Sequence, residues 1–412
     1  MDNSNIVDFC VRLSKYMIFS GANLERVQIA IARISNTYGL KDVSTLLLST
    51  FISLGARMPD GTYISRQTAI PTADNNLQRL KQLNRLTYTI AETKPDIKEL
   101  NGMLDKALKV ESYPQWLVNI AQIAGMSCVC MMFGGGPGEV FCTALIVAVL
   151  QQVMRIMARP RIDQVIVNAV LMFIATGLAC LIESDYSVNV PVIVITAIIM
   201  ILPGIPLVNA SRNLLCGNES NGVLQLLRIN IETMALAAGI VLAMTVFGWE
   251  GTIQETVVYG PSHPGLLIPL SFAVSLFTGV TFRIAPKDLL LAGMGGAISR
   301  VVLIFLTSFM NRPLIYTFIA AMVAALYAEF LATSRKDPST YFVYPAILPM
   351  IPGGAFYYMI MGVYGADRAM FSSYLMECTL TLVGMSIGFV VSSIVAHYMR
   401  RMRHVHIEWY EI

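Results

Sequence analysis

Pro203 and Gly204 interrupt an apolar stretch, residues 188–208, that is long enough to cross a membrane as a helix. Proline has no N–H and glycine weakens a helix, so the break frees carbonyl groups of the preceding turn. A helix that restarts at Leu207–Asn209 directs its N–H groups and its positive dipole end at the break. Freed carbonyls suit an ammonium group, free N–H groups suit a carboxylate, and an α-amino acid presents both. A kink that only serves helix packing is the alternative.

A second apolar stretch, "AILPMIPGGAFYYMIMGVYG" from Ala346, contains the same kind of break. Sliding the chain against itself by 149 positions aligns Pro203–Gly204 with Pro352–Gly353. Two breaks at matching positions favour a functional role over a kink. Polar residues follow the first break, although a cytoplasmic loop would be equally polar. The residues expected to bind a substrate are Pro203, Gly204, Asn209, Arg212, Pro352, Gly353 and Gly354.

Four acidic residues are candidates to carry a coupling proton, because an ionisable side chain at membrane depth is costly and desolvation helps a carboxylate to hold a proton. Each also has a structural interpretation. Glu232 can form a salt bridge with Arg228 one turn earlier, and Glu329 can interact with basic residues that follow its helix. The other two follow prolines at helix starts, where an acid stabilises the N-terminus. The four are Glu232, Glu329, Glu139 and Asp288.

The elements that must position these residues are membrane helices. Of the 412 residues, 55% are hydrophobic and 13% are charged, and the first 115 residues hold 14 of the 29 Lys and Arg. A membrane helix needs about 20 mostly apolar residues. The sequence predicts ten such helices, at residues 116–133, 137–154, 164–182, 188–208, 226–248, 264–282, 288–306, 314–332, 341–362 and 374–398.

The basic residues between these helices predict the orientation. With the N-terminus inside, the outer loops carry only Arg312 and Arg368. The inner loops and the tail carry Arg155, Arg159, Arg161, Arg212, Arg228, Arg283, Lys287, Arg335, Lys336, Arg400, Arg401 and Arg403. We therefore expect a multi-pass protein of the cell membrane with both termini in the cytoplasm.

The shift of 149 positions also aligns Phe133 with Phe282, and it aligns acidic Glu139 with acidic Asp288. Ten helices divide into two groups of five, at residues 116–250 and 251–412. Because five is odd, the second group must be inverted relative to the first. Inverted repeats with interrupted helices at the midplane are typical of secondary transporters. The expected fold is therefore a mainly α membrane protein, a 5+5 inverted repeat preceded by a small α+β domain.

Residues 1–115 are expected to form that cytoplasmic α+β domain. Helical patterns at both ends flank two predicted strands, "DVSTLLLSTFISLGARM" and "TYISRQTAI", joined by a turn at Asp60–Gly61. The domain contains no histidine, which excludes a Ser-His-Asp or Cys-His mechanism within it. We expect no enzyme, and the histidine spacing elsewhere indicates no metal site or cofactor.

The segments around both breaks resemble the threonine/serine exporter family. The similar stretches are "LPGIPLVNASRNLLCGNESNGVLQLLRINIETMALAAGI", "LYAEFLATSRKDPSTYFVYPAILPMIPGGAFYYMIMG" and the N-terminal "FSGANLERVQIAIARISNTYGL" with "PDGTYISRQTAI". The chain looks like the fused form, with both modules in one polypeptide. Asn213 departs from the family pattern, where an acid is expected. The resemblance marks Pro203, Gly204, Asn209, Arg212, Glu232, Glu329, Pro352 and Gly353.

The resemblance implies a proton-linked exporter of small hydrophilic amino acids such as threonine and serine. Its expected partners are that substrate, protons and the lipid bilayer, with no nucleic acid, and a homo-oligomer is left open. Dicarboxylate export is an alternative that needs more positive charge at the midplane, where Arg300 and Arg212 are available. A membrane-anchored enzyme or sensor that acts through the N-terminal domain is an alternative of another class.

Overall fold

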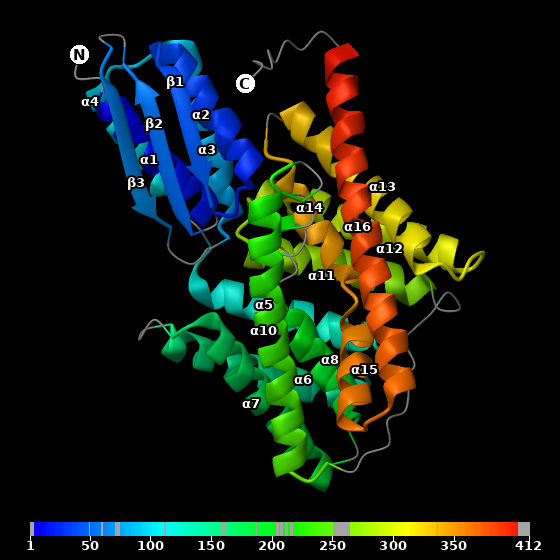
Figure 1. Cartoon of the computed structure of the whole chain (residues 1–412). Coiled ribbons are helices and arrows are strands. Elements are labelled where there is room, and N and C mark those ends of the chain that lie inside the picture. Colours follow the sequence, from blue (N-terminus) through cyan, green and yellow to red (C-terminus); the bar gives the residue numbers. More distant parts are fainter. Residues whose placement is uncertain are drawn as a thin grey trace. The chain divides into compact units, whose positions relative to one another are not determined.

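The computed structural model (Figure 1) divides by its internal contacts into two compact units. Unit 1 comprises Met1–Pro114, Phe282–Pro286 and Leu331–Phe342, and unit 2 comprises Gln115–Thr281, Lys287–Phe330 and Val343–Ile412. The structure describes residues 4–48, 50–58, 61–70, 75–110, 113–158, 162–186, 188–202, 206, 209–210, 213–214, 217–249, 264–335 and 337–402.

Unit 1 is a three-stranded antiparallel sheet, in the order β1-β2-β3, with helices packed on one of its faces (Figure 1). Ile52, Leu54 and Ala56 alternate along β2 and are fully buried, as expected for the face of a strand that packs on helices. The elements are α1 (Ser4–Phe19), α2 (Leu24–Tyr38), β1 (Lys41–Leu47), β2 (Phe51–Arg57), β3 (Tyr63–Ala69), α3 (Leu77–Thr93) and α4 (Ile97–Leu108).

One prediction for this sheet is confirmed and one is wrong. The strands expected on either side of Asp60–Gly61 pair with each other as β2 and β3, with Arg57 opposite Tyr63, and Asp60 itself lies outside the described residues. The preceding run, however, is a hairpin of two strands, because β1 ends at Leu47 and β2 pairs back on it from Phe51. The run of 17 residues is far longer than a typical strand of 5–6 residues, and the polar residues in its middle allow the chain to reverse.

Two short segments from the C-terminal half of the chain belong to unit 1. The Leu77 N–H donates to the Phe282 carbonyl at 3.0 Å, and the Ala285 N–H donates to the Tyr341 hydroxyl at 2.7 Å. Asp337 is paired with Lys81 at 2.6 Å, and the Asp337 side chain is 0% exposed. These bonds fix residues 282–286 and 331–342 to the N-terminal domain.

Unit 2 is helical. By length and composition, seven of its described helices can cross a membrane, or eight if the bent pair α14–η2 and α15 is one span. Three of its elements, η1, α13 and α14, extend into the segments of unit 1. The elements are α5 (Gln115–Met132), α6 (Pro137–Met157), α7 (Gln164–Asp185), α8 (Val190–Ile201), α10 (Glu219–Val246), α11 (Pro264–Thr281), η1 (Pro286–Asp288), α12 (Leu289–Thr307), α13 (Pro313–Arg335), α14 (Thr340–Ile347), η2 (Leu348–Met350), α15 (Gly353–Tyr364) and α16 (Arg368–Met402).

Seven or eight spans are fewer than the ten expected from the sequence. The difference lies in α8 and in Gly265–Thr281 of α11, which are apolar but too short to count as spans in the described residues. Helix α8 ends at Ile201. The next residue, Leu202, precedes Pro203, and a proline disfavours the helical conformation of the residue before it. The ten predicted helices therefore correspond to ten apolar segments, of which seven or eight have the length of a span.

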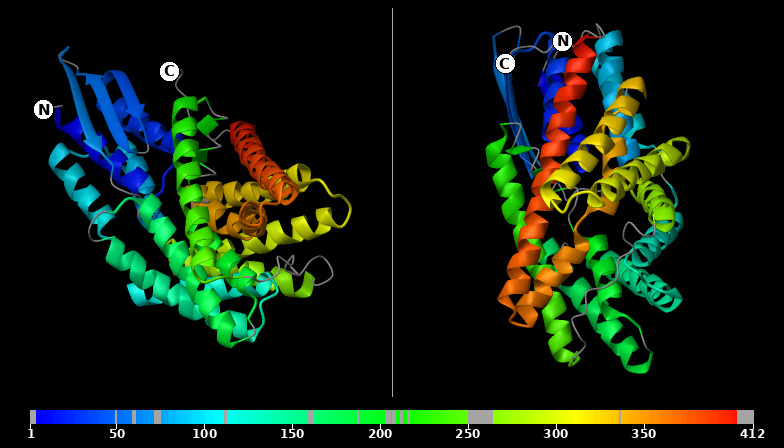
Figure 2. Two further views of the ribbon diagram at one scale, coloured as in Figure 1. Left: turned by 60° about the horizontal axis from the view of Figure 1, so that its bottom comes forward. Right: turned by 90° about the vertical axis from the view of Figure 1, so that its right-hand side faces the viewer.

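Elements 149 residues apart begin at corresponding positions in the two halves of unit 2. The pairs are α5 at Gln115 with α11 at Pro264, α6 at Pro137 with η1 at Pro286, α7 at Gln164 with α13 at Pro313, and α10 at Glu219 with α16 at Arg368. The two long helices of the last pair, α10 and α16, run in opposite directions in Figure 1 and in the right-hand view of Figure 2.

A helix contact recurs at the same spacing. A Cβ on Gly239 of α10 would overlap the Ala169 carbonyl oxygen and crowd the Phe173 nitrogen on α7. A Cβ on Gly388 of α16 would overlap the Phe318 carbonyl oxygen and crowd the Met322 nitrogen on α13. All three residues of the first contact lie 149 positions before those of the second. Glycine allows the close approach of backbones that membrane helices use to pack.

Candidate functional site

The second predicted break is present. Helix α14 and η2 end at Met350, α15 begins at Gly353, and the two parts are bent by 49°. Ile351 between them is extended, with ψ 129°, as the residue before a proline prefers. Pro352 is the N-cap of α15. Because an interrupted helix cannot bond its own backbone at the break, other groups must satisfy it.

The first break begins in the same way. Leu202 follows the end of α8 with φ −55° and ψ 129°, and Ile351, 149 residues later, has φ −61° and ψ 129°. Pro203, Gly204 and Arg212, which were expected to bind a substrate, lie outside the described residues. The geometry of this break is therefore defined by its edges, Leu202 on one side and Asn209 on the other.

The two break regions contact one another within unit 2. The Tyr344 hydroxyl on α14 donates to Asn209 Oδ1 at 3.1 Å. Gly353 is buried at the start of α15, where a Cβ would overlap the Ile199 side chain at the end of α8. A Cβ on Gly354 would lie 3.0 Å from the Phe133 ring. Of the predicted binding residues, Asn209, Gly353 and Gly354 thus lie where the two interrupted helices meet.

Three side chains of α11 and α12 supply hydrogen bonds to carbonyls of the broken helix. Pro349 has no N–H to offer the Pro345 carbonyl, and Ser275 Oγ donates to that carbonyl at 2.8 Å. Ser299 Oγ lies 3.1 Å from the Ala346 carbonyl. Arg300 Nη2 donates to the Pro349 carbonyl at 2.6 Å. These bonds explain how an interrupted helix persists at membrane depth.

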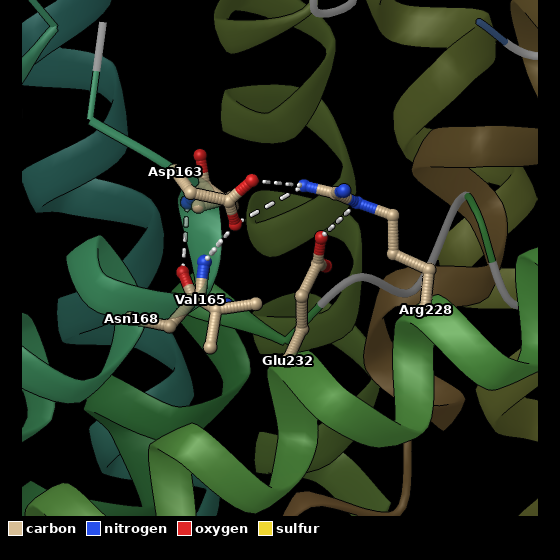
Figure 3. Close-up of polar contacts among 6 residues, drawn as sticks. Asp163, Val165, Asn168, Arg228 and Glu232 are labelled. Atoms are coloured by element: carbon tan, nitrogen blue, oxygen red, sulfur yellow. Dashed lines mark hydrogen bonds and ion pairs between the residues drawn. The ribbon is translucent and has the colours of Figure 1, made fainter.

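A separate charged cluster links α7 and α10 (Figure 3). Arg228 Nε donates to Glu232 Oε1 at 2.9 Å, the i,i+4 pair that the sequence allowed. The other end of the guanidinium donates to both carboxylate oxygens of Asp163 at 3.4 Å. The Glu232 side chain is 11% exposed, whereas those of Arg228 and Asp163 are 52% and 54% exposed. Glu232 is therefore the buried member of a cluster that is open at its other end.

Asp163 also caps α7, because its Oδ1 accepts the Val165 N–H at 3.0 Å. That bond, together with the Arg228 guanidinium, holds the pKa of the Asp163 carboxyl below its usual value. Asp163 thus stays ionised over the physiological range. Its negative charge fixes the far side of Arg228, while the near side faces Glu232.

Glu139 has a structural role in this arrangement. Its Oε2 accepts the Gly136 N–H at 2.9 Å, and its Oε1 accepts the Asn189 N–H at 3.0 Å. The residue therefore satisfies the start of α6 and also holds the residue that caps α8. The contacts favour the helix-stabilising interpretation of Glu139 over proton coupling.

The other two acidic candidates are buried. Asp288 is the N-cap of α12, but its side chain makes no capping hydrogen bond to that helix. Glu329 lies on α13, six residues before its end at Arg335. For Glu232, the ion pair with Arg228 defines the geometry of the carboxylate.

Several residues of the site were not singled out from the sequence. Ser275, Ser299 and Tyr344 are common polar residues in apolar helices, and Asp163 lies in a loop. One signal was present in the sequence. Pro349 follows Pro345 by four residues, and because Pro349 has no N–H, the Pro345 carbonyl lacks its helical hydrogen bond. No local pattern indicates which distant hydroxyl fills that position.

Comparison with protein-family models gives two matches that together cover most of the chain. Residues 8–247 match the ThrE model, described as a threonine/serine exporter, and residues 268–395 match the ThrE_2 model, "Threonine/Serine exporter, ThrE". The interval between the two matches, residues 248–267, begins after the end of α10 at Val246 and includes the first four residues of α11.

Among curated proteins, a "Probable threonine/serine exporter" of Mycobacterium tuberculosis is 22% identical over 410 residues, which is 96% of this chain and 77% of the relative. The "Probable succinate transporter subunit YjjP" of Escherichia coli is 22% identical over 60% of this chain and 97% of its own length. The YjjP of Klebsiella aerogenes is 20% identical over 60% of this chain and 95% of its length. No solved structure gave a significant match.

Proposed function

Because the chain belongs to the threonine/serine exporter family, we propose that it exports small hydrophilic amino acids of the threonine/serine type, coupled to protons. It is a multi-pass membrane protein by its family and its apolar helices. The observation that carries the proposal is the contact between the two break regions within one unit. Tyr344 bonds Asn209, and Gly353 packs on Ile199. These contacts support the proposal because secondary transporters with interrupted helices bind their substrates beside the breaks.

The membrane part is proposed to be an inverted repeat of five plus five helices, residues 116–250 and 251–412. The recurring glycine contact of Gly239 and Gly388 supports the duplication. The opposite directions of α10 and α16 support the inversion (Figure 1). Such a repeat places the two breaks on opposite sides of a central pathway, so that alternate access to one site becomes possible.

We place the protein in the cell membrane, with the N-terminal domain and both termini on the cytoplasmic side. Arg283 and Arg335 lie in the two C-terminal segments that belong to unit 1, residues 282–286 and 331–342. These two segments would therefore lie on the same side of the membrane as residues 1–114. This agrees with the concentration of basic residues in loops expected to be cytoplasmic. Homo-oligomerisation stays a prediction.

Proton coupling is proposed to reside at Glu232. The carboxylate is buried on a membrane helix, and its ion partner Arg228 is shared with the more exposed Asp163. A proton on Glu232 would release Arg228 toward Asp163, so the protonation state of one buried acid changes the bonding between α7 and α10. Glu329, Asp288 and, with less support, Glu139 are the other acids retained in the proposal.

The test of export uses the purified full-length chain in lipid vesicles loaded with labelled threonine, serine or succinate. Efflux of threonine or serine that accelerates with an inwardly directed proton gradient is the expected result. Vesicles without protein and vesicles with the gradient collapsed by an ionophore are the controls. No efflux of any of the three compounds would contradict the proposed function.

Replacing Glu232 by Gln should abolish the pH dependence of efflux, because an amide of similar shape cannot take up the proton. The matched control is Asp163→Asn, which removes the other acid on Arg228 and keeps a side chain able to cap α7. Efflux rates measured from about pH 5.5 to about pH 8.5 distinguish the two variants. A pH profile of Glu232→Gln that matches the wild type would remove Glu232 from the coupling proposal.

Dicarboxylate export is the second candidate. It is favoured by the similarity of 60% of this chain to the probable succinate transporter subunit YjjP. The same vesicles decide between the two. Succinate efflux that exceeds threonine and serine efflux would replace the amino acid assignment with the dicarboxylate one.

A further inference from the structure

Arg300 is a charged residue inside a membrane span. It lies on α12, within the apolar span Pro286–Thr307, and its side chain reaches α11 and the η2 turn of the broken helix. A charged side chain at the middle of a membrane helix costs about 2.5–3.5 kcal/mol on insertion scales. Such a residue persists where it has a partner or a function.

The contacts of Arg300 use only part of its hydrogen-bonding capacity. Nε donates to Ser271 Oγ at 3.0 Å, and Nη2 donates to the Pro349 carbonyl at 2.6 Å. A guanidinium carries five N–H donors in a fixed plane, suited to a carboxylate. Two of these donors make the contacts above, and among the described residues the other donors of this partly buried side chain have no protein acceptor. A hydroxyl would suffice for the carbonyl alone, as Ser275 and Ser299 show nearby.

The two groups that Arg300 contacts are both neutral. Ser271 is fully buried, and the Pro349 oxygen belongs to the backbone of the break. In the part of the chain that the structure describes, no Asp or Glu forms an ion pair with this guanidinium. The positive charge is therefore uncompensated by the protein at the place where the interrupted helix passes.

The corresponding positions of the first half are polar but uncharged. Gln151 and Gln122 lie 149 residues before Arg300 and Ser271. Gln151 Nε2 donates to Gln122 Oε1 at 3.0 Å and to the Asn119 carbonyl at 3.0 Å. Both halves thus carry a hydrogen-bonded pair between corresponding helices, and only the second pair has a charge. The first pair carries no charge that needs a partner, whereas the second pair carries the positive charge of Arg300.

We propose that Arg300, positioned by Ser271, binds a carboxylate of the transported substrate beside the break of α14 and α15. This rests on the proposed function and specifies which group of the substrate is recognised. The positive charge of Arg300 repels the ammonium end of an amino acid. That end would then lie away from the guanidinium, toward carbonyls of the interrupted helix. A dicarboxylate would use the same guanidinium for one of its two ends.

The test uses full-length protein in lipid vesicles and three variants, Arg300→Gln, Arg300→Lys and Ser271→Ala. The exposed Arg312→Gln, which removes one positive charge from the loop before α13, is the matched control. Transport is measured with labelled L-threonine, and L-threoninol, which lacks the carboxylate, is the unlabelled competitor. Arg300→Gln should raise the KM for threonine about 10- to 100-fold, the usual effect of losing a charge-assisted hydrogen bond.

Arg300→Lys keeps the charge without the planar fork and should fall between wild type and Arg300→Gln. Threoninol should fail to compete in the wild type. Thermal unfolding in detergent, with and without threonine or succinate, gives a second readout that needs no transport. The wild type and Arg312→Gln should be stabilised by the carboxylate compounds, and Arg300→Gln should not. If Arg300→Gln does not fold, Ser271→Ala and Arg300→Lys carry the comparison.

Two failures are distinguishable. Wild-type efflux with an unchanged KM in Arg300→Gln would overturn this inference and leave the proposed function standing. A wild type that transports none of the substrates would overturn the proposed function, and the thermal experiment then decides the site alone. Stabilisation by carboxylates that Arg300→Gln loses would support the carboxylate site, and equal or absent stabilisation in both proteins would overturn it.

Discussion

Replacing Asp337 by Ala should destabilise unit 1 by about 3–5 kcal/mol, the usual effect of removing one partner from a buried ion pair. The Lys81 ammonium lies 2.6 Å from the Asp337 carboxylate, and the two side chains are 4% and 0% exposed. Without the carboxylate, the buried ammonium of Lys81 loses its anionic partner and keeps the face of the Tyr341 ring, 4.6 Å from the ring centre. Arg85 would lose its 3.1 Å bond to the same carboxylate.

Cys10 provides the measurement. It is the only one of the seven cysteines in unit 1, it is fully buried, and burial raises the pKa of its thiol to about 12. Labelling by a maleimide therefore requires unit 1 to open. In a full-length chain whose other cysteines are alanine, Asp337→Ala should accelerate labelling by about 100-fold or more, since 1.4 kcal/mol corresponds to a factor of about ten.

The matched control is Asp105→Ala, which removes an exposed partner of Arg12. That pair has side chains that are 44% and 57% exposed, so its loss should change the labelling rate by less than about fivefold. Equal labelling rates in the two variants would show that the Asp337 ion pair contributes no more than a surface pair. The attachment of residues 331–342 to the domain would then rest on other contacts.

Alanine at Gly239 and at Gly388 should destabilise unit 2 to a similar extent. At both positions the new Cβ overlaps a backbone carbonyl oxygen of the neighbouring helix, Ala169 in one case and Phe318 in the other. Backbone atoms cannot rotate away, so the helices must separate. Overpacking of this kind costs about 1–3 kcal/mol, which lowers Tm by roughly 2–10 °C in a unit of this size.

Gly265→Ala is the control, because nothing lies within 4 Å of a Cβ at this position on α11. Alanine there should be neutral or stabilise by up to about 1 kcal/mol through helix propensity. The three variants are compared by thermal unfolding in one detergent. A loss at Gly239 with none at Gly388 would mean that the two helix contacts are not equivalent, and it would weaken the proposal of a repeat.

The correspondence between the two halves depended on both kinds of information. Sliding the sequence by 149 positions aligned the Pro-Gly breaks, and identities in apolar sequence are frequent by chance. The structure adds that Leu202 and Ile351 share one backbone conformation, and that Gly239 and Gly388 make the same contact. Packing at one register is a stricter criterion than matching letters, because a shift of one residue turns a helical side chain by about 100°.

Where sequence reasoning was too coarse, the cause was competition between local signals. The 17-residue run at residues 42–58 is predicted from the sequence as one strand, but it folds as parts of two paired strands, β1 and β2. Its β-branched and apolar residues suit a strand throughout, and only pairing between its two halves shows where it turns. Likewise, hydropathy counts α8 as a span, while the proline at 203 ends the helix at Ile201.

The sequence by itself determined the class of the protein, the positions of the breaks and the pair Arg228–Glu232, because each depends on neighbours within about one helical turn or on average apolarity. The tertiary structure decided what lies opposite each of these residues. Asp337 pairs with Lys81 across more than 250 positions, Ser275 bonds the Pro345 carbonyl, and Arg300 reaches Pro349. Such partners are chosen by helix packing, which brings together residues that share no local pattern.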